Sequence, residues 1–348
     1  MKKEKIISSI IIIIFFIIFS VFNFGEYYDF HKQKIENTKN YENNKNILKN
    51  FDIKNIKEIK NISLRHTPNK DLLDEIVKKI ENSKEKIYIE VYMFTENRIK
   101  TALIKAKKRG IDVKVILEKD PYMAYSINDK TYNELKKNTI EVVWSNTKNY
   151  SLNHSKMIII DDEIILSTGN LTYSTFTQNR DFFVFIKDKK ILLDFLKIFD
   201  YDFNGIKNYV ENENIVISPN NSRIKIEKLF ENAKNEIKIY MQYLNDEEMN
   251  QKLLKLKEKD NLKIQIIIDE TAINNETTKN LQNKGIEIKK LPKYKMHSKA
   301  ILIDNETIFI GSVNFSNYSL DKNRELGILT NDKQIIIDFL DRFKTDFK

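Results

Sequence analysis

Two eight-residue stretches of this 348-residue chain have nearly the same sequence, and each places a lysine two positions after a histidine. Residues 154–161 and residues 297–304 both read His-Ser-Lys, then four apolar residues, then Asp. The whole chain has only four histidines. Because two of them occupy the same position in the same pattern, these stretches are where the function is best sought.

The residue types in the two stretches suit attack on a phosphodiester. An imidazole with a reference pKa near ~6.5 can act as a neutral nucleophile or as a protonated acid. Two histidines on opposite sides of one phosphorus could divide the work, one attacking and holding the phosphoryl group while the other protonates the leaving oxygen. A lysine beside each would bind the non-bridging oxygens. The candidate catalytic residues are therefore His154, Lys156, His297 and Lys299.

The similarity continues past the Asp and adds candidate hydrogen-bond donors. Residues 164–172 align with residues 308–316 if the first turn is one residue shorter. The aligned polar side chains would donate hydrogen bonds to the phosphate, and Ser167 is an alternative to Thr168 for the hydroxyl of the first copy. The predicted substrate-binding residues are Asn170, Thr168, Ser312 and Asn314.

An acidic residue recurs further along each copy. Residues 179–181 read Asn-Arg-Asp and residues 323–325 read Asn-Arg-Glu. Asp181 and Glu325 would hold the histidines in the right tautomer by accepting a hydrogen bond from the other ring nitrogen. Arg180 and Arg324, beside them, fit either packing ion pairs or phosphate binding.

The segments that must position these residues are also duplicated. Apolar periodicity predicts helices over 71–80 and 99–109 and strands over 87–93 and 113–117. The second half predicts helices over 226–233 and 250–258 and strands over 237–243 and 263–268. One module of about 140 residues is therefore written twice. Alternating strands and helices predict a sheet covered on both faces.

The geometry of a strand explains the spacing of the motif. Side chains two positions apart point the same way, so a histidine and the lysine two residues later project together. Asp161 and Asp304 stand where each strand turns back, and an Asp at a turn most simply accepts hydrogen bonds from backbone N–H groups. We expect a structural role for both.

The doubled pattern H-x-K-x4-D-x6-G-S-x-N resembles that of the phospholipase D superfamily. Residues 297–314 match it fully, and the resemblance covers most of the chain from residue 62 onward. The first copy departs from it, because its spacing after Asp161 is one residue shorter and residues 167–170 read Ser-Thr-Gly-Asn where G-S-x-N is expected.

The resemblance implies an α/β fold of two α/β/α sandwich halves related by pseudo-two-fold symmetry, with both His-Lys pairs in one cleft. It also implies a mechanism that needs no metal or other cofactor and passes through a covalent phosphohistidine. In related enzymes the histidine of the N-terminal copy is usually the nucleophile, which would be His154.

Composition limits the remaining choices. The absence of Cys excludes disulfides, thiolate metal sites and a Cys nucleophile. With 41% hydrophobic residues the chain can form a globular core. Its 59 basic and 50 acidic residues give a net charge of +9, which suits a lipid headgroup or a nucleic acid equally.

The N-terminus predicts one transmembrane helix. Residues 6–22 carry no charge, and such a segment nearly spans a bilayer core of ~30 Å. A cleaved signal peptide is the alternative. Three lysines precede the segment and two acidic residues follow it, so the catalytic body is expected on the extracytoplasmic side of a single-pass membrane protein.

These observations divide the chain into four parts and suggest one function with two alternatives. The parts are an anchor (1–24), a polar tether (25–60), a first half (61–210) and a second half (211–348) that pair within the molecule. An anchored phosphodiesterase of phospholipase D type, hydrolysing or transphosphatidylating glycerophospholipids in a membrane, is the leading hypothesis. The alternatives are a nonspecific endonuclease of the same superfamily and a cardiolipin-synthase-like phosphatidyltransferase.

Overall fold

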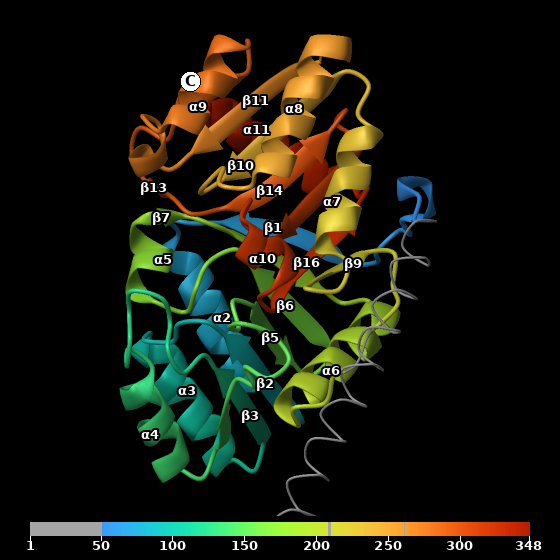
Figure 1. The fold of residues 1–348 in the computed structure, drawn as a ribbon. Coiled ribbons are helices and arrows are strands. Elements are labelled where there is room, and N and C mark those ends of the chain that lie inside the picture. Colours follow the sequence, from blue (N-terminus) through green and yellow to red (C-terminus); the bar gives the residue numbers. More distant parts are fainter. Residues whose placement is uncertain (1–50, 208–209, 261) are drawn as a thin grey trace, which may run out of the picture. The chain divides into compact units, whose positions relative to one another are not determined.

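The computed structural model describes residues 51–207, 210–260 and 262–348. Residues 51–348 form one compact unit, which Figure 1 shows from blue through green for the first half to yellow and red for the second. The predicted transmembrane helix lies outside the described residues. Within the described ranges, no helix is both long enough and apolar enough to cross a bilayer.

Each half is built on a seven-stranded mixed sheet. The first sheet has, in spatial order, β1 (Ile62–His66), β8 (Phe182–Ile186), β6 (Glu163–Ser167), β5 (Lys156–Ile160), β2 (Lys86–Val91), β3 (Asp112–Leu117) and β4 (Glu141–Trp144). The second has β9 (Ile215–Ser218), β16 (Glu325–Thr330), β15 (Thr307–Gly311), β14 (Lys299–Ile303), β10 (Glu236–Met241), β11 (Lys263–Ile268) and β12 (Glu287–Lys290).

The two sheets have the same topology, as the internal repeat predicts. In both, the three strands that alternate with helices are parallel, namely β2, β3 and β4 or β10, β11 and β12. The motif strand, β5 or β14, then runs antiparallel to the first of these. The expected mixed α/β fold with two sheet-containing halves is therefore confirmed.

Helices cover the sheets and build the cores. The first half contains α2 (Lys70–Asn82), α3 (Asn97–Lys108), α4 (Asp129–Lys137), α5 (Tyr173–Thr177) and α6 (Lys189–Phe203). The second contains α7 (Ser222–Glu231), α8 (Glu247–Asp260), α9 (Glu276–Asn283), α10 (Asn317–Asp321) and α11 (Lys333–Asp346). The four helices predicted from periodicity correspond to α2, α3, α7 and α8.

One hydrophobic cluster belongs to both halves. It contains residues of α6 and α11 and of both sheets. Phe182 of β8 lies 5.2 Å from Tyr240 of β10 and 5.7 Å from Phe339 of α11, measured between ring centroids. Such aromatic contacts bury a large apolar area. The halves therefore share a core, which holds their motifs in a fixed relation.

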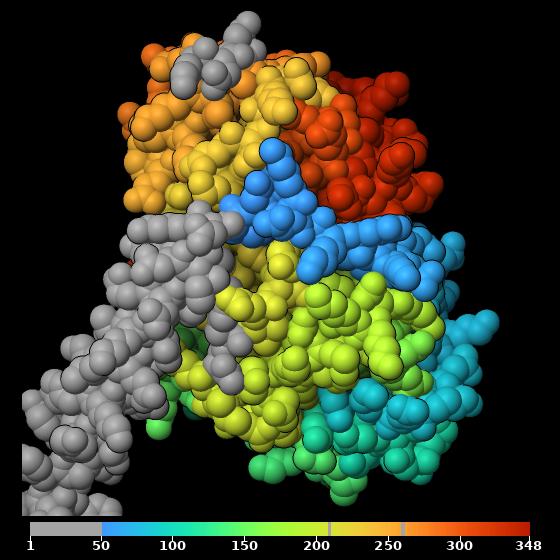
Figure 2. Space-filling model, turned by 90° about the vertical axis from the view of Figure 1, so that its right-hand side faces the viewer, coloured from blue at the N-terminus to red at the C-terminus, as the bar shows by residue number. Residues whose placement is uncertain are grey.

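Residues 51–66 join the halves from outside. Ile56 packs into the core of the second half, whereas β1 pairs with β8 of the first half and also contacts α11. Figure 2 shows this segment in blue, lying across the boundary between the halves. Residues 51–60, which composition assigned to the tether, thus pack on the body, because Ile56 and Ile59 bury their side chains there.

Asp161 and Asp304 have the structural role expected of them. The Asp161 carboxylate accepts hydrogen bonds of 2.8–3.1 Å from the backbone N–H groups of residues 84–86. Asp304 accepts three from residues 234–236, at 2.7–3.0 Å. Both residues turn the chain with positive φ angles, of 52° and 51°. Each carboxylate ties the motif hairpin to the start of the neighbouring strand.

Candidate active site

Each His-Ser-Lys motif forms a backbone hydrogen bond with the other half of the molecule. The backbone N–H of His154 donates to the carbonyl oxygen of Arg324 at 2.8 Å. The N–H of His297 donates to the carbonyl oxygen of Arg180 at 3.2 Å, next to the two-stranded parallel sheet of β7 (Asn179–Arg180) and β13 (Lys295–Met296). In both copies, the residue just before the acid therefore binds the backbone of the histidine in the other copy.

The histidine side chains also contact the opposite half, because the carboxylate beside each one belongs to the other copy. The Nδ1 of His154 lies 2.8 Å from Oε2 of Glu325, and the Nδ1 of His297 lies 2.9 Å from Oδ1 of Asp181. An ionised carboxylate can only accept, so Nδ1 carries the proton in both pairs. Both Nε2 atoms then keep a lone pair while the imidazoles are neutral. Sequence reasoning named all four residues but did not assign these partners.

Burial keeps both imidazoles neutral. Only 14% of the His154 side chain and 13% of the His297 side chain are exposed. Burial lowers the pKa of His154 to about 4, against the opposing effect of Glu325. Burial also lowers the pKa of His297, again against the effect of its acid, Asp181. A buried neutral imidazole with a free lone pair on Nε2 is a competent nucleophile at neutral pH.

Asp181 stays ionised although it is completely buried. Burial by itself would raise its pKa, but His297, Lys299 and a hydrogen bond from Thr168 together lower it. Its Oδ1 accepts both the His297 Nδ1–H and, at 2.7 Å, the Thr168 hydroxyl. Glu325 likewise accepts from a hydroxyl, that of Ser319. Each acid is therefore oriented by a hydroxyl from its own half.

The two lysines are buried beside the histidines. The Nζ of Lys156 donates to the carbonyl oxygen of His154 at 2.5 Å, and the Nζ of Lys299 donates to that of His297. Burial lowers the pKa of Lys156 well below its usual value and that of Lys299 to about 8. Each lysine also lowers the pKa of both histidines. The two His-Lys pairs thus lie within electrostatic range of each other, as one centre requires.

The predicted phosphate donors fall into two groups. The hydroxyls of Thr168 and Ser312 are buried and accept from the backbone N–H groups of Phe182 and Leu326. This equivalence identifies Thr168, and not Ser167, as the counterpart of Ser312. Both hydroxyls already have partners within the protein, so their contact with substrate stays a prediction.

The two asparagines have unused hydrogen-bonding capacity. Asn170 follows β6 and Asn314 follows β15, at equivalent places in the two halves. The side-chain oxygen of each is buried and has no hydrogen-bond partner among the described residues. Amide groups with unmade hydrogen bonds at both copies are suited to bind a ligand that completes them.

The altered motif of the first copy has a steric cause. A Cβ atom on Gly169 would lie 2.6 Å from the Asp181 carboxylate and 2.7 Å from the Thr175 side chain. Such distances are well inside van der Waals contact. Val313 occupies the same position in the second copy. The glycine therefore gives Asp181 the space it uses to reach His297.

The arginines beside the acids form ion pairs between the halves. Arg180 pairs with Asp346 at 2.6 Å, and Arg324 pairs with Asp202 at 2.7 Å. In each pair the arginine belongs to one half and the acid to the other, as in the histidine–carboxylate pairs. Of the two roles open from sequence, the described contacts are those of packing ion pairs.

A buried carboxyl group that binds the two residues flanking His154 was missed by the sequence reasoning. Glu90 accepts hydrogen bonds from the Asn153 amide and the Ser155 hydroxyl, both at 2.7 Å. Burial and the neighbouring Asp202 raise the pKa of Glu90 to about 8. The raised pKa favours the protonated form of Glu90, which can donate a hydrogen bond to Asp202. Glu90 aligns with Tyr240 of the second half. The sequence feature that could have revealed it is an acidic residue inside a predicted strand, where the other copy has a tyrosine.

Tyr92 was also missed, although it contacts both members of the first pair. Its ring centroid lies 4.7 Å from that of His154, edge to face, and 5.2 Å from the Nζ of Lys156. The aligned residue of the second half is Gln242. The first half-site is therefore the more apolar of the two.

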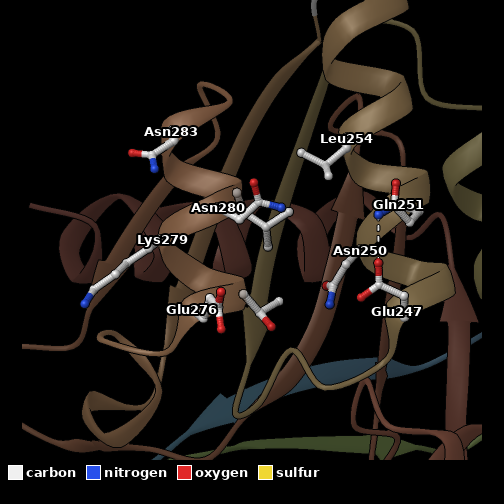
Figure 3. Close-up of a pocket in the computed structure, with 10 residues that line it drawn as sticks. Glu247, Asn250, Gln251, Leu254, Glu276, Lys279, Asn280 and Asn283 are labelled. Carbon is white, nitrogen blue, oxygen red and sulfur yellow. Dashed lines mark hydrogen bonds between the residues drawn. The ribbon is translucent and has the colours of Figure 1, made fainter.

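Other features of the molecule lie apart from these residues. A pocket of about 460 Å³ between α8 and α9 is lined by ten residues, among them Asn250, Gln251 and Asn280, and by none of the predicted site residues. Figure 3 shows its amide and carboxylate side chains. Over residues 51–207, 210–260 and 262–348, no three His, Asp or Glu side chains gather as metal ligands would.

The sequence of this chain is similar to those of several known proteins. A family model described as "Cardiolipin synthase, PLD-like domain" matches residues 76–203 and again residues 226–347. The phospholipase D of Rickettsia prowazekii is 31% identical over 138 residues, 39% of this chain and 65% of that protein. Cardiolipin synthase 1 of Staphylococcus aureus is 24% identical over 323 residues, 79% of this chain and 65% of that protein. The chain thus spans about 65% of the length of these relatives.

Solved structures share the fold over most of the chain. The phosphatidylserine synthase of Haemophilus influenzae superposes with a TM-score of 0.66 at 14% identity, covering 88% of this chain and 90% of that one. A polyphosphate kinase from Porphyromonas gingivalis also superposes with a TM-score of 0.66, at 18% identity, over 82% of this chain and 50% of its own. The family matches cover both motifs and all strands of the two sheets except β1 and β9, and the chain therefore belongs to the phospholipase D superfamily.

Proposed function

We propose that this protein is a membrane-anchored phospholipase D that cleaves glycerophospholipids on the headgroup side of the phosphodiester. Residues 1–24 would anchor it, and the halves 61–210 and 211–348, related by a pseudo-two-fold axis, would act together on the extracytoplasmic side. The phospholipase D relatives from Rickettsia support this choice. The alternative of a phosphatidyltransferase is supported by the cardiolipin synthase relatives and differs only in the acceptor.

The observation that carries the proposal is the pair of exchanged histidine–carboxylate contacts. Each contact directs one Nε2 away from its carboxylate, and both imidazoles are neutral in the free protein. Neither half contains a complete site, because the acid for each histidine comes from the other half. This arrangement suits a substrate with one phosphorus between two histidines.

In the proposed reaction the Nε2 lone pair of His154 attacks the phosphorus. The bond from phosphorus to the headgroup oxygen breaks, and that oxygen takes a proton from Nε2–H of His297. Binding of the anionic phosphodiester would first raise the pKa of His297, so that its Nε2 takes a proton from solvent. Lys156 and Lys299 would hold the non-bridging oxygens, and the side-chain N–H groups of Asn170 and Asn314 would donate hydrogen bonds to the same oxygens.

Water completes the cycle. It gives a proton to the Nε2 of His297 and attacks the phosphorus, and the phosphorus–nitrogen bond breaks to return the lone pair to His154. The product is phosphatidic acid. An alcohol in place of water would give a transfer product by the same steps.

The difference between the half-sites supports His154 as the nucleophile. Tyr92 packs its ring against His154, whereas the second half has Gln242 at the equivalent position. An aromatic neighbour excludes water and disfavours the charged imidazolium. The imidazole with the pKa of about 4 is therefore suited to attack, and the other to carry a proton.

The pH dependence of kcat/KM should show two limbs. Activity should fall below about pH 4, because His154 then becomes protonated and loses its lone pair. Activity should fall again above about pH 8, where Lys299 loses the charge that binds phosphate. Initial rates with a soluble p-nitrophenyl phosphodiester, whose leaving group needs no proton from His297, would measure both limbs between pH 3 and pH 10.

Arginine at position 299 provides the control for the alkaline limb. Its guanidinium stays protonated throughout this range, so Lys299→Arg should remove the limb from the residual activity. If the limb stays near pH 8 in that variant, another group causes it.

The substrate class can be decided by incubating the full chain with phospholipid vesicles in a buffer that contains a chelator. The protein should release phosphatidic acid from mixed phospholipid vesicles, or transfer the phosphatidyl group to glycerol. Both products should disappear in His154→Ala and His297→Ala. Cleavage of DNA under the same conditions without turnover of lipid would contradict the proposal and support the endonuclease.

A further inference from the structure

The loop between β3 and α4, two elements labelled in Figure 1, exposes a group of large apolar side chains. Tyr122 is 70% exposed, Met123 81% and Tyr125 68%, and Ile127 is 37% exposed. Single exposed apolar residues are ordinary on protein surfaces, but four within six positions are not. We refer to residues 121–127 as the apolar loop.

The base of the apolar loop is held firmly while its tip projects. The backbone N–H of Tyr122 donates to the Tyr92 hydroxyl at 2.7 Å. At the other end, Asn128 is fully buried; its amide donates to the carbonyl oxygens of Tyr92 and Glu118 and accepts from the N–H of Phe94. The backbone therefore directs the apolar side chains into solvent, although nothing within the described chain covers them.

This loop adjoins the first half-site. Tyr92, which binds the loop through its hydroxyl, packs the edge of its ring against His154 and lies under the Nζ of Lys156. A single side chain thus separates the backbone of the apolar loop from the proposed nucleophile. Whatever binds the loop is brought beside that half-site.

The second half lacks this feature. Its equivalent connection, from β11 to α9, contains the 3-10 helix η2 (Glu270–Ala272) and the polar residues Asn274 and Asn275. The large apolar side chain there, Ile273, is partly buried. Since the halves otherwise share one topology, the apolar loop is an addition to the first half and not a requirement of the fold.

We propose that the apolar loop inserts into the interfacial layer of a phospholipid bilayer and places a lipid phosphodiester beside His154. This inference rests on the proposed phospholipase function and identifies the surface that brings the enzyme to its substrate. Tyrosine suits the interface between headgroups and acyl chains because its ring is apolar and its hydroxyl is polar. Methionine and isoleucine would enter the acyl region.

The charges around the loop favour a bilayer over a nucleic acid. Its exposed neighbours are Lys119 and Asp120 on one side and Asp129 and Lys130 on the other, and their formal charges cancel. Binding to a nucleic acid is driven by a local excess of basic residues. Met123 offers no ring on which a base could stack. Apolar partition is therefore the interaction that this surface supports.

Insertion can be measured directly because the natural chain contains no cysteine. A fluorophore would be attached in the full chain to Met123→Cys, or to Ile337→Cys on α11, where the natural side chain is 50% exposed. In vesicles with brominated acyl chains we expect strong quenching of the label at position 123 and little at position 337. Because both variants keep the N-terminal segment, the comparison does not depend on how the chain is anchored. Equal quenching at the two positions would overturn the proposal.

A kinetic test separates this inference from the proposed function. Serine at Met123, Tyr125 and Ile127 should lower the ratio of vesicle turnover to soluble-diester turnover about tenfold or more, since the variant loses the apolar side chains that would enter the bilayer. The control has serine at three exposed apolar residues elsewhere, Leu193, Ile206 and Ile337, and should keep the ratio.

The possible outcomes are distinct. If the natural chain hydrolyses the soluble diester but no phospholipid, the proposed function fails. If it hydrolyses phospholipid vesicles and the loop variant keeps the natural ratio, the function stands and the loop inference is wrong. If the loop variant instead loses cleavage of single-stranded DNA, the loop is a nucleic-acid surface and the proposal is overturned.

Discussion

Replacing His154 by alanine should abolish the covalent phosphohistidine and lower kcat on the order of 10⁴-fold or more, the scale on which loss of a nucleophile acts. The reason is that His154 supplies the lone pair that attacks phosphorus, and its low pKa keeps that pair available at neutral pH. A substrate labelled at phosphorus, quenched in alkali during turnover, would show the label on the natural protein and none on the variant.

The matching change at His297 should have a different signature. His297→Ala removes the proton donor, so an alkoxide headgroup leaves about 10²–10⁴-fold more slowly. A p-nitrophenyl phosphodiester needs no such proton, and with it the intermediate should form and accumulate. If instead His297→Ala abolishes labelling and His154→Ala does not, the two histidines have the opposite roles.

The second prediction concerns Asp181 and Glu325, the acids that each contact the histidine of the other half. Asp181→Asn should reproduce the effects of His297→Ala, although Asp181 belongs to the half that contains His154, because its carboxylate lies 2.9 Å from the Nδ1 of His297. Glu325→Gln should reproduce the loss of labelling seen with His154→Ala. Each change should cost about 10³–10⁴-fold in kcat, since an amide permits the wrong imidazole tautomer.

The same labelling assay, run with the p-nitrophenyl diester, distinguishes the two acid variants. Asp304→Asn is a matched control, because it removes the same charge from a carboxylate that binds only backbone N–H groups. It should lower stability without changing labelling. If Asp181→Asn abolishes labelling while Glu325→Gln preserves it, each acid acts within its own half and the exchanged contacts have no catalytic consequence.

Much of the fold could be predicted because it depends on local patterns. Periodicity located the helices and strands around the motifs within a few residues, and the repeat implied that both sheets would have one topology. The turn role of Asp161 and Asp304 also followed from their position. The first strand of each sheet, β1 or β9, was not foreseen, since both are short and pair with segments distant in sequence.

The candidate site was predicted in its members but not in its connections. Spacing within one copy identifies a histidine, a lysine and an acid, but it carries no information on contacts between copies. Glu90 was missed because its partners, Asn153, Ser155 and Asp202, are 63 or more positions away in the chain. Gly169 read as a departure from the motif, whereas its lack of a Cβ makes room for Asp181.

The sequence by itself therefore determined that one motif occurs twice, and it predicted a phosphodiester site with His154 and His297 as its reactive residues. The tertiary structure alone decided that each histidine takes its acid from the other half, and that the two imidazoles lie in different surroundings. The physical reason is that pKa values and hydrogen-bond partners depend on distance through space and on burial, not on separation along the chain. Two nearly identical motifs thus lie in different surroundings, since Tyr92 packs against His154 whereas the second half has Gln242 at the aligned position.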